Sequence, residues 1–180
     1  MRWSDRLLQR WRIHTAQRWI PDGAAVLDIG CYQGELFQVL ATRLGSGIGI
    51  DPLARELTTP AYRLLPLSFS EPLPFPDQSF DAVVLLATLE HMSDKDPLAR
   101  ECRRLLRPNG RVIITVPSPL VDVIVETMVK LRLADGMSLE QHHGFKPQET
   151  VPLFASNGFD LERQTRFQLG LNYLFVFKRS

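Results

Sequence analysis

This sequence of 180 residues has only two cysteines, no long apolar run and almost no excess of charge of either sign. The two cysteines, Cys31 and Cys102, are too few for a disulfide framework and stand at no metal-ligand spacing with the four histidines. We therefore expect two reduced thiols and no metal site. No stretch approaches the roughly 18 apolar residues of a membrane span, and the start of the chain lacks the apolar run of a signal peptide. These absences predict a cytoplasmic protein.

The charges nearly balance, with 21 basic and 20 acidic residues giving a formal net charge of +1. Because no overall positive field is present to hold a phosphate backbone, we expect no nucleic acid as a partner. The first twenty residues nevertheless carry five arginines against Asp5 alone. With Trp3, Leu7 and Trp11 on one side, they predict a basic amphipathic helix over residues 1–20. Its apolar side could cover the core, cover a substrate site, touch an anionic membrane surface or form a dimer contact.

Length and composition favour one globular domain. With 180 residues, 44% hydrophobic and 23% charged, the chain is large and apolar enough for a single packed core. Apolar, β-branched runs alternate with helical patterns, which is typical of βαβ units. The predicted strands are residues 25–29, 48–50, 62–67, 80–86, 111–116, 161–165 and 172–178. The sequence therefore predicts an α/β fold, with a doubly wound seven-stranded sheet between two helical layers.

Two helices between these strands are marked by their ends. Residues 35–44 follow Gly34 and stop at Gly45, and residues 97–106 begin with Pro97 after Asp96 as N-cap. Only about six residues, 166–171, join the last two strands, which is too few for a helical crossover. We therefore expect the last strand to run antiparallel to its neighbours.

A glycine-bounded turn follows the first strand, in the run from Asp28 through Gly30 to Gly34. Glycines there let the backbone approach a ligand closely, in the crevice at the carboxyl ends of the strands. Asp51 ends the second strand, 21 residues after Gly30, about the spacing at which an acidic side chain meets ribose hydroxyls. Tyr32 stands where a dinucleotide fingerprint needs glycine, which disfavours a pyrophosphate site. The pattern predicts a nucleoside site, although both aspartates could also be ordinary turn residues.

Five short segments follow one another in a particular order. They are the turn with Asp28, Gly30 and Gly34, the strand end Ile50-Asp51, residues 73–83, the tripeptide Leu89-Glu90-His91, and residues 106–111. In content and order they resemble the class I S-adenosylmethionine-dependent methyltransferases, and in particular the branch that includes quinone-biosynthesis methyltransferases. The resemblance covers residues 26–117, about half of the chain. Each motif alone is weak, but their ordered occurrence is specific.

This resemblance implies a fold and an activity. The fold is a single methyltransferase-like domain over residues 1–180, Rossmann-like, with seven strands in the order 3-2-1-4-5-7-6. The cofactor is S-adenosylmethionine, the product S-adenosylhomocysteine, and the reaction a direct displacement onto a small, apolar or aromatic acceptor molecule. Residues 119–145 form a lid-like insertion over the acceptor site, although their apolar stripe could equally pack on the sheet.

The resemblance also assigns site residues. The turn at Gly30 passes under the methionine part of the cofactor, Asp28 reaches toward the ammonium, and Asp51 accepts the ribose hydroxyls. His91 is the candidate catalytic group, either as a base or as a residue that shapes the pocket. The expected cofactor-binding residues are Asp28, Gly30, Cys31, Tyr32, Gly34, Asp51, Pro52, Ser70, Leu86 and Ala87.

Two positions depart from the family's pattern. Tyr32 replaces the middle glycine of the turn, and Phe69 replaces the acidic residue that accepts the adenine amino group. Ser68, Ser70 or a backbone carbonyl would then accept that hydrogen bond. The departures leave a second hypothesis open, in which a degenerate methyltransferase-fold protein serves as a binding or partner subunit. A nucleotide-dependent oxidoreductase is a third hypothesis, which the misplaced glycines disfavour.

The assignment of Asp51 can be tested by substitution. Asp51→Ala is expected to weaken cofactor binding by about 1.5–3 kcal/mol, because charge-assisted hydrogen bonds to the ribose are lost. A calorimetric titration of the variant measures the change. Unchanged affinity would remove Asp51 from the site.

Overall fold

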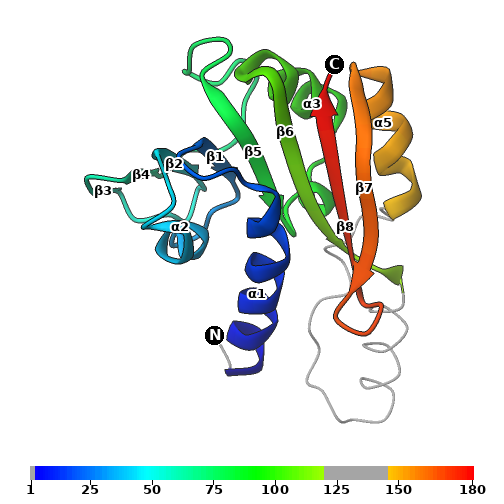
Figure 1. Cartoon of the computed structure of the whole chain (residues 1–180), viewed down its shortest axis with the longest axis horizontal. Helices are drawn as coiled ribbons and strands as arrows, with labels where there is room; N and C mark the ends of the chain where they lie inside the picture. The colour runs from blue at the N-terminus through cyan, green and yellow to red at the C-terminus, as the bar shows by residue number, and fades with distance from the viewer. Residues whose placement is uncertain (1–2, 120–145) are drawn as a thin grey trace.

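The structure is a computed structural model, and it describes residues 3–119 and 146–180. The insertion expected over residues 119–145 therefore lies, except for its first residue, outside the described residues. The described parts of the chain form a sheet with helices on both faces (Figure 1).

Eight strands make up one sheet, in the order β3-β4-β2-β1-β5-β6-β8-β7. Strands β4, β2, β1, β5 and β6 are parallel neighbours, whereas β8 runs antiparallel to both β6 and β7. The strands are β1 Ala25–Ile29, β2 Ser46–Ile50, β3 Leu57–Thr58, β4 Tyr62–Leu65, β5 Phe80–Leu86, β6 Leu106–Pro117, β7 Phe159–Phe167 and β8 Asn172–Arg179. The predicted strand order and the antiparallel last strand are thus confirmed.

Two details of the sheet differ from the prediction. The additional strand β3 pairs antiparallel with the edge strand β4, and at two residues it is too short to show a periodic pattern in the sequence. Thr59 closes the turn between them, because its hydroxyl accepts the backbone N–H of Tyr62 at 2.9 Å. Strand β6 starts at Leu106 rather than at residue 111, and its register against β5 shifts where Asn109 adopts a φ of 65°.

The helices lie close to their expected positions. Helix α2 ends at residue 40 instead of 44, and the backbone N–H groups of Arg43 and Leu44 then both donate to the carbonyl of Leu40 in the turn that follows. Pro97 occupies the first turn of α3, as predicted. The helices are α1 Trp3–Ala16, α2 Glu35–Leu40, α3 Asp96–Leu105 and α5 Thr150–Ser156, with 3₁₀ turns η1 Gln17–Trp19, η2 Leu89–His91 and η4 Pro147–Glu149.

Alternate residues of the central strands face opposite helical layers, as the two-residue period of a strand requires. Leu27 and Ile29 of β1 belong to the core that includes α3 and Phe154 of α5. Val26 belongs to the second core, which includes Ile13 of α1 and residues of α2. Asp28 follows the same alternation as Val26 and therefore faces the layer of α1 and α2. This parity decides which groups can surround its carboxylate.

The proline-rich segment before β5 is fastened to α3 through one buried side chain. Glu101 is 2% exposed and accepts the backbone N–H of Leu73 at 2.7 Å. The same carboxylate pairs with Arg104 at 2.6 Å, and Arg104 in turn donates to the carbonyls of Leu73 and Phe75. The buried Glu101–Arg104 pair thus holds the middle of this loop. The ion pairs Arg100–Glu71 and Arg104–Asp77 fasten its two ends to the same helix.

We expect Glu101→Ala to lower the free energy of unfolding by about 2–4 kcal/mol, because it leaves the buried N–H of Leu73 without its acceptor and removes the buried carboxylate that pairs with Arg104. Urea unfolding measures this change. Asp22→Ala is the matched control, since Asp22 pairs with Arg43 at the surface, and its effect should stay within about 1 kcal/mol. Equal effects of the two substitutions would contradict the role given to Glu101.

Candidate functional site

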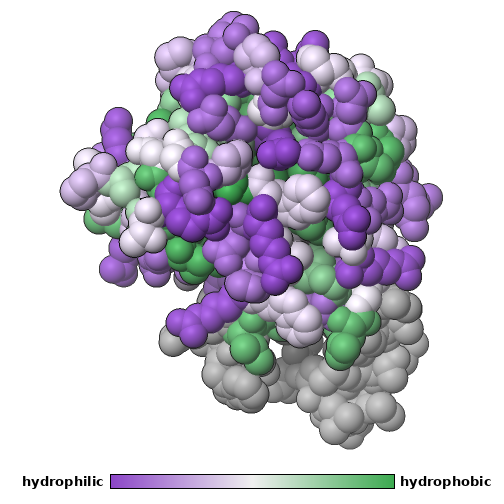
Figure 2. Space-filling view, in the orientation of Figure 1, coloured by the Kyte–Doolittle hydropathy of each residue, from purple (hydrophilic) through white to green (hydrophobic). Residues whose placement is uncertain are grey.

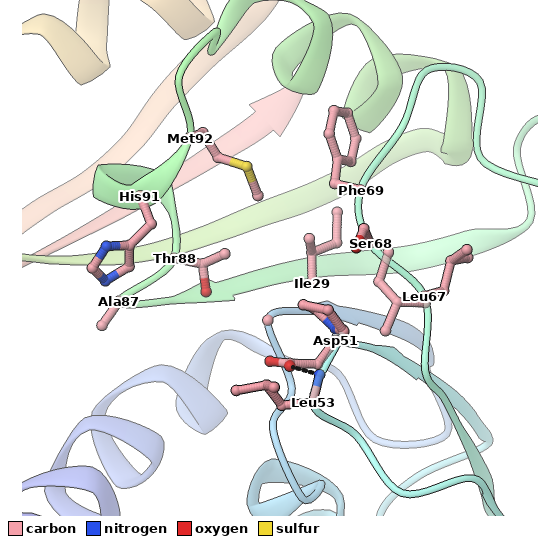
Figure 3. Close-up of a pocket in the computed structure, with 13 residues that line it drawn as sticks. Ile29, Asp51, Leu53, Leu67, Ser68, Phe69, Ala87, Thr88, His91 and Met92 are labelled. Carbon is pink, nitrogen blue, oxygen red and sulfur yellow. Dashed lines mark hydrogen bonds between the residues drawn. The ribbon is translucent and has the colours of Figure 1, made fainter. Parts of the chain in front are cut away.

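A cavity of about 810 Å³ opens at the carboxyl ends of β1, β2, β4 and β5. Figure 3 shows that its lining comes from four segments: the end of β1, the loop after β2, the loop after β4, and the segment after β5 that includes η2. The lining residues are Ile29, Gly30, Ile50, Asp51, Pro52, Leu53, Leu67, Ser68, Phe69, Ala87, Thr88, His91 and Met92. Most of them are apolar, and the charged group among them is the carboxylate of Asp51.

The turn after β1 is packed too tightly for a side chain at its first glycine. Gly30 has a φ of 82°, and a Cβ placed on it would lie 2.3 Å from Oγ1 of Thr88. Its backbone N–H donates to the carbonyl of Ile50 at 2.8 Å, which ties the end of β1 to the end of β2. The backbone of the turn therefore forms part of the cavity wall itself.

Asp51 holds two loops with one carboxylate. One oxygen accepts the backbone N–H of Tyr32 at 3.0 Å, and the other accepts the N–H of Leu53 at 2.8 Å, the contact drawn in Figure 3. A carboxylate oxygen has two lone pairs, so each oxygen keeps acceptor capacity for a ligand in the cavity. The side chain is fixed before any ligand arrives.

Tyr32 occupies the turn in a strained conformation. Its φ is 47°, in the left-handed region that costs residues with a side chain roughly 1–2 kcal/mol. The hydrogen bond of its N–H to Asp51 holds this conformation. The tyrosine side chain is 43% exposed, so the turn keeps a glycine-like backbone and directs the ring outward.

A second cavity, of about 40 Å³, lies on the other side of the same turn. Arg12 of α1 lines it together with Asp28 and Glu35. Within the described residues, three charged groups near it have a buried atom without a hydrogen-bond partner: Nε of Arg12, Oδ1 of Asp28 and Oε2 of Glu90. Buried charged groups normally have their hydrogen bonds satisfied. A cavity of this size has room for about one water molecule, so these three atoms mark hydrogen-bonding capacity of both signs that water or a ligand group could satisfy.

The electrostatics of this cluster follow from burial. Burial raises the pKa of Asp28 to about 8, and the neighbouring carboxylates of Glu35 and Asp51 raise it further. Burial also raises the pKa of Glu90 to about 7, against the opposing charges of Arg12 and Lys95. The pKa of Arg12 is lowered by burial, while Glu90 counteracts this shift. An ammonium group beside Asp28 would favour its ionised form.

The two cavities contain most of the residues expected at the site. Gly30, Asp51, Pro52, Ala87 and the candidate base His91 line the larger cavity. The smaller one is lined, among others, by Asp28, Gly30, Cys31, Tyr32 and Leu86. What any of them binds stays a prediction.

Two expected residues lie outside both linings. Gly34 has a φ of 76° at the start of α2, where a Cβ would come within 2.9 Å of Leu64, so it shapes the turn from behind. Ser70 does not line the cavity, whereas its neighbours Ser68 and Phe69 do. Of the side-chain acceptors considered for an adenine amino group, Ser68 is the one in position.

The sequence patterns missed Arg12, Thr88 and Met92. Thr88 and Met92 follow β5 at the carboxyl edge, so their place after a parallel strand could have indicated them. Glu90 is 2% exposed and is absent from the cavity lining, although its neighbour His91 belongs to it. No local motif marks Arg12, because its position depends on how α1 packs against the sheet.

No helix among residues 3–119 and 146–180 is long and apolar enough to cross a membrane. In the same part of the chain, no three His, Cys, Asp or Glu side chains are grouped as metal ligands. Burial raises the pKa of the thiols of Cys31 and Cys102, so both are held as neutral thiols.

Comparison with known proteins gives consistent results. A methyltransferase domain family matches residues 27–114. A ubiquinone biosynthesis O-methyltransferase of Xanthomonas axonopodis pv. citri is 30% identical over 164 residues, covering 83% of this chain and 68% of that protein. A 2-methyl-6-phytyl-1,4-hydroquinone methyltransferase of Synechocystis sp. is 34% identical over 115 residues, covering 57% of this chain and 36% of that protein. The chain thus spans about two thirds of the first relative and about a third of the second.

A likeness to solved structures extends over almost the whole chain. The structure of a SAM-dependent methyltransferase from Aquifex aeolicus matches with a TM-score of 0.68 and 13% identity, covering 94% of this chain and 89% of that one. At this low identity the match supports the fold alone.

The raised pKa of Asp28 gives the stability of the protein a pH dependence. In the unfolded chain Asp28 loses its proton near pH 4, but in the folded protein near pH 8. Between these values the folded state binds more protons, so the free energy of unfolding falls as pH rises. We expect Asp28→Asn to remove this contribution and to be more stable, relative to the parent, at pH 8 than at pH 5.

Urea unfolding of the ligand-free protein at both pH values measures the difference. The surface substitution Asp22→Asn is the control and should follow the parent protein at both. A difference between Asp28→Asn and the parent that does not change with pH would contradict a raised pKa at Asp28.

Proposed function

Because this chain belongs to the class I S-adenosylmethionine-dependent methyltransferases, we propose that it transfers the methyl group of that cofactor to a small, apolar or aromatic acceptor. The observation that carries the proposal is the pairing of two features at one turn. Asp51 presents a fixed carboxylate to the larger cavity, and Asp28 presents a buried, unpartnered oxygen to the smaller one. A nucleoside joined to an amino acid needs these two acceptors.

The residues present fit the cofactor. The cavity of about 810 Å³ has the size of sites that hold a whole cofactor-sized ligand. Gly30 has no Cβ, and one placed there would lie 2.3 Å from Thr88. The backbone of Gly30 therefore lines both cavities directly. Few polar groups in the site are free to form further hydrogen bonds. This is expected of a site where polar groups fix the orientation of the ligand and apolar residues supply the contact area.

At the nucleoside end, Asp51 would accept the ribose hydroxyls with the lone pairs that the backbone amides leave free. Pro52, Leu53 and Phe69 supply apolar surface to the adenine ring, and Ser68 is in place to accept its amino group. Phe69 can contact the ring but cannot accept a hydrogen bond, so this chain would bind adenine mainly through apolar contact.

At the amino-acid end, Asp28 would pair with the ammonium group, and Arg12 with the carboxylate. Both side chains line the smaller cavity, and each has a buried atom without a partner in the described structure. The negative charge of Glu90 acts on Arg12 and supports its cationic form in this buried place. The N-terminal helix would therefore complete the cofactor site.

When bound, the cofactor supplies a methyl group on a positively charged sulfur, which a nucleophile displaces directly. The protein's part is alignment and the exclusion of water. Met92, Leu67 and Ile29 give the cavity an apolar wall suited to that task. Where the acceptor is a hydroxyl, His91 at the cavity can take up its proton.

The acceptor class is supported by the cavity and by the relatives. The wall is largely apolar, and the relatives named above act in ubiquinone biosynthesis or on a phytyl hydroquinone. We therefore propose an aromatic hydroxyl or ring carbon, carried on an apolar molecule, as the methylated position.

Calorimetric titration of the purified protein with S-adenosylmethionine and S-adenosylhomocysteine tests the proposal, with NADH as the control ligand. We expect micromolar binding of the first two and no binding of NADH. If neither of the first two binds, the protein is a methyltransferase-fold subunit of another kind, and the proposed activity is wrong.

The role of Arg12 predicts a selective loss of affinity. Arg12→Met should weaken the binding of S-adenosylhomocysteine by roughly 10- to 100-fold, because a charge-assisted hydrogen bond to its carboxylate is lost. Binding of 5′-methylthioadenosine, which lacks the amino-acid end, should not change. Both affinities are measured by the same titration.

Arg10→Met is the matched control, since Arg10 is an exposed arginine of the same helix. It should leave both affinities unchanged. If Arg12→Met weakened the two ligands equally, Arg12 would support the fold of the site instead of contacting the amino acid.

A further inference from the structure

Helix α1 carries apolar side chains on two sides. Ile13 and Ala16 are buried against the sheet, as the covering helix of a domain requires. Leu7, Leu8 and Trp11 are nevertheless 58%, 44% and 46% exposed. These three positions lie within about one third of the helix circumference, at 100° per residue. The exposed side of α1 is therefore an apolar stripe that the core does not use.

The tip of the β7–β8 hairpin exposes a fourth large apolar residue. Leu169 is 93% exposed, the highest value among the exposed large hydrophobic residues of the described chain. Gln168 and Leu169 both have positive φ values, 51° and 57°, which are unfavourable for residues with a side chain. The N–H of Gly170 donates to the carbonyl of Phe167 at 3.1 Å, so these two residues are the central pair of a type I′ hairpin turn, which requires a positive φ at both.

A buried amide pair fastens this tip to α1. The side chain of Gln168, 2% exposed, donates to the carbonyl of Leu8 at 2.7 Å. Asn172 donates to the side-chain oxygen of Gln168 at 2.5 Å and fixes its orientation. The hydrogen bond from Gln168 to Leu8 holds the hairpin tip against α1. We call the exposed apolar residues of the two elements the apolar rim: Leu7, Leu8, Trp11 and Leu169.

The charges on α1 beside the apolar rim are mostly basic, with Asp5 as the one acidic residue of this helix. Between Leu7 and Trp19 the chain has three arginines and no acidic residue. Arg10 and Arg18 of this stretch are exposed. An exposed surface of leucine, tryptophan and arginine matches the interfacial zone of an anionic membrane, where apolar groups enter between the headgroups and cations meet the phosphates.

The apolar rim also lies on the functional side of the molecule. In Figure 1, α1 and the β7–β8 hairpin extend beyond the carboxyl ends of the parallel strands, the edge where the larger cavity opens. Figure 2 shows hydrophobic surface at the outer end of α1 and at the tip of this hairpin. A surface that met the apolar rim would face this edge of the sheet.

We propose that the apolar rim docks the protein on an anionic lipid surface, with Leu7, Trp11 and Leu169 in the interfacial layer and Arg10 beside the headgroups. The docking itself does not depend on the proposed function. It would give that function access to an apolar acceptor dissolved in the membrane, and this part of the inference rests on the proposed function.

Co-sedimentation with vesicles tests the docking. We expect the protein to bind vesicles of phosphatidylcholine containing about a third phosphatidylglycerol, and to bind vesicles of phosphatidylcholine alone much more weakly. Binding should fall as salt is added, because part of the attraction is electrostatic. Absence of binding to the anionic vesicles would overturn the proposal.

Leu169→Gly is the sharpest variant. Glycine adopts a φ of 57° without strain, so the change should leave the thermal midpoint unchanged or raise it while removing an inserting side chain. We expect weaker vesicle binding, by about threefold to tenfold. A binding loss in a protein of undiminished stability could not be ascribed to unfolding.

Two further variants separate the contributions. Leu7→Gln should weaken binding to anionic and neutral vesicles alike, whereas Arg10→Gln should act on the anionic vesicles alone, by about fivefold. Val39→Gln is the control, since Val39 is 46% exposed on α2, and it should bind like the parent. Equal losses in Val39→Gln and Leu169→Gly would overturn the proposal.

Sedimentation velocity tests whether a second copy of the protein, instead of a membrane, covers the apolar rim. If the protein were a dimer that Leu7→Gln or Leu169→Gly made monomeric, the apolar rim would be an interface between copies and the membrane proposal would be wrong. The cofactor titration is read independently, so failure of docking and failure of the proposed function cannot be confused.

Discussion

The carboxylate of Asp51 joins the ends of two neighbouring strands, and the rest of the site depends on it. By accepting the N–H groups of Tyr32 and Leu53, it fixes the turn after β1 and the loop after β2 in one arrangement. The left-handed backbone at Tyr32 is held by the same hydrogen bond. A ligand that bound Asp51 would therefore meet a prearranged acceptor and would lose little free energy in ordering the loops.

The site also contains buried polar atoms without a hydrogen-bond partner among the described residues. Asp28, Glu90 and Arg12 each have a buried polar atom without a partner in the described structure. Such groups lower the stability of the ligand-free protein, and burial shifts the pKa of both carboxyl groups upward as a result. A zwitterionic ligand end would satisfy charges of both signs at once. The cost of burying these atoms without partners would then be recovered on binding such a ligand.

Helix α1 links the two proposals made for this protein. One side of it is buried, Arg12 reaches the small cavity, and the exposed side carries most of the apolar rim. The side chain of Gln168 in the β7–β8 hairpin donates to the carbonyl of Leu8 in α1. The apolar rim is therefore formed by an N-terminal helix and a C-terminal hairpin that contact each other. An acceptor drawn from a lipid surface would then enter at the edge where the cofactor is held.

The sequence by itself determined the order and direction of the seven main strands, the turn at Gly30 and the acidic end of β2. The strand positions, the turn and the acidic strand end follow from local periodicity, from glycine and from spacing along the chain, whereas the order of the strands in the sheet is what the resemblance to the methyltransferase family implies. Only the tertiary structure decided that Asp28 faces α1, that Arg12 reaches the same cavity, that Ser68 rather than Ser70 lines the site, and that Gln168 bonds to the carbonyl of Leu8. Each of these depends on contacts between segments far apart in sequence. The packing of helices on the sheet fixes such contacts, and no local pattern encodes them.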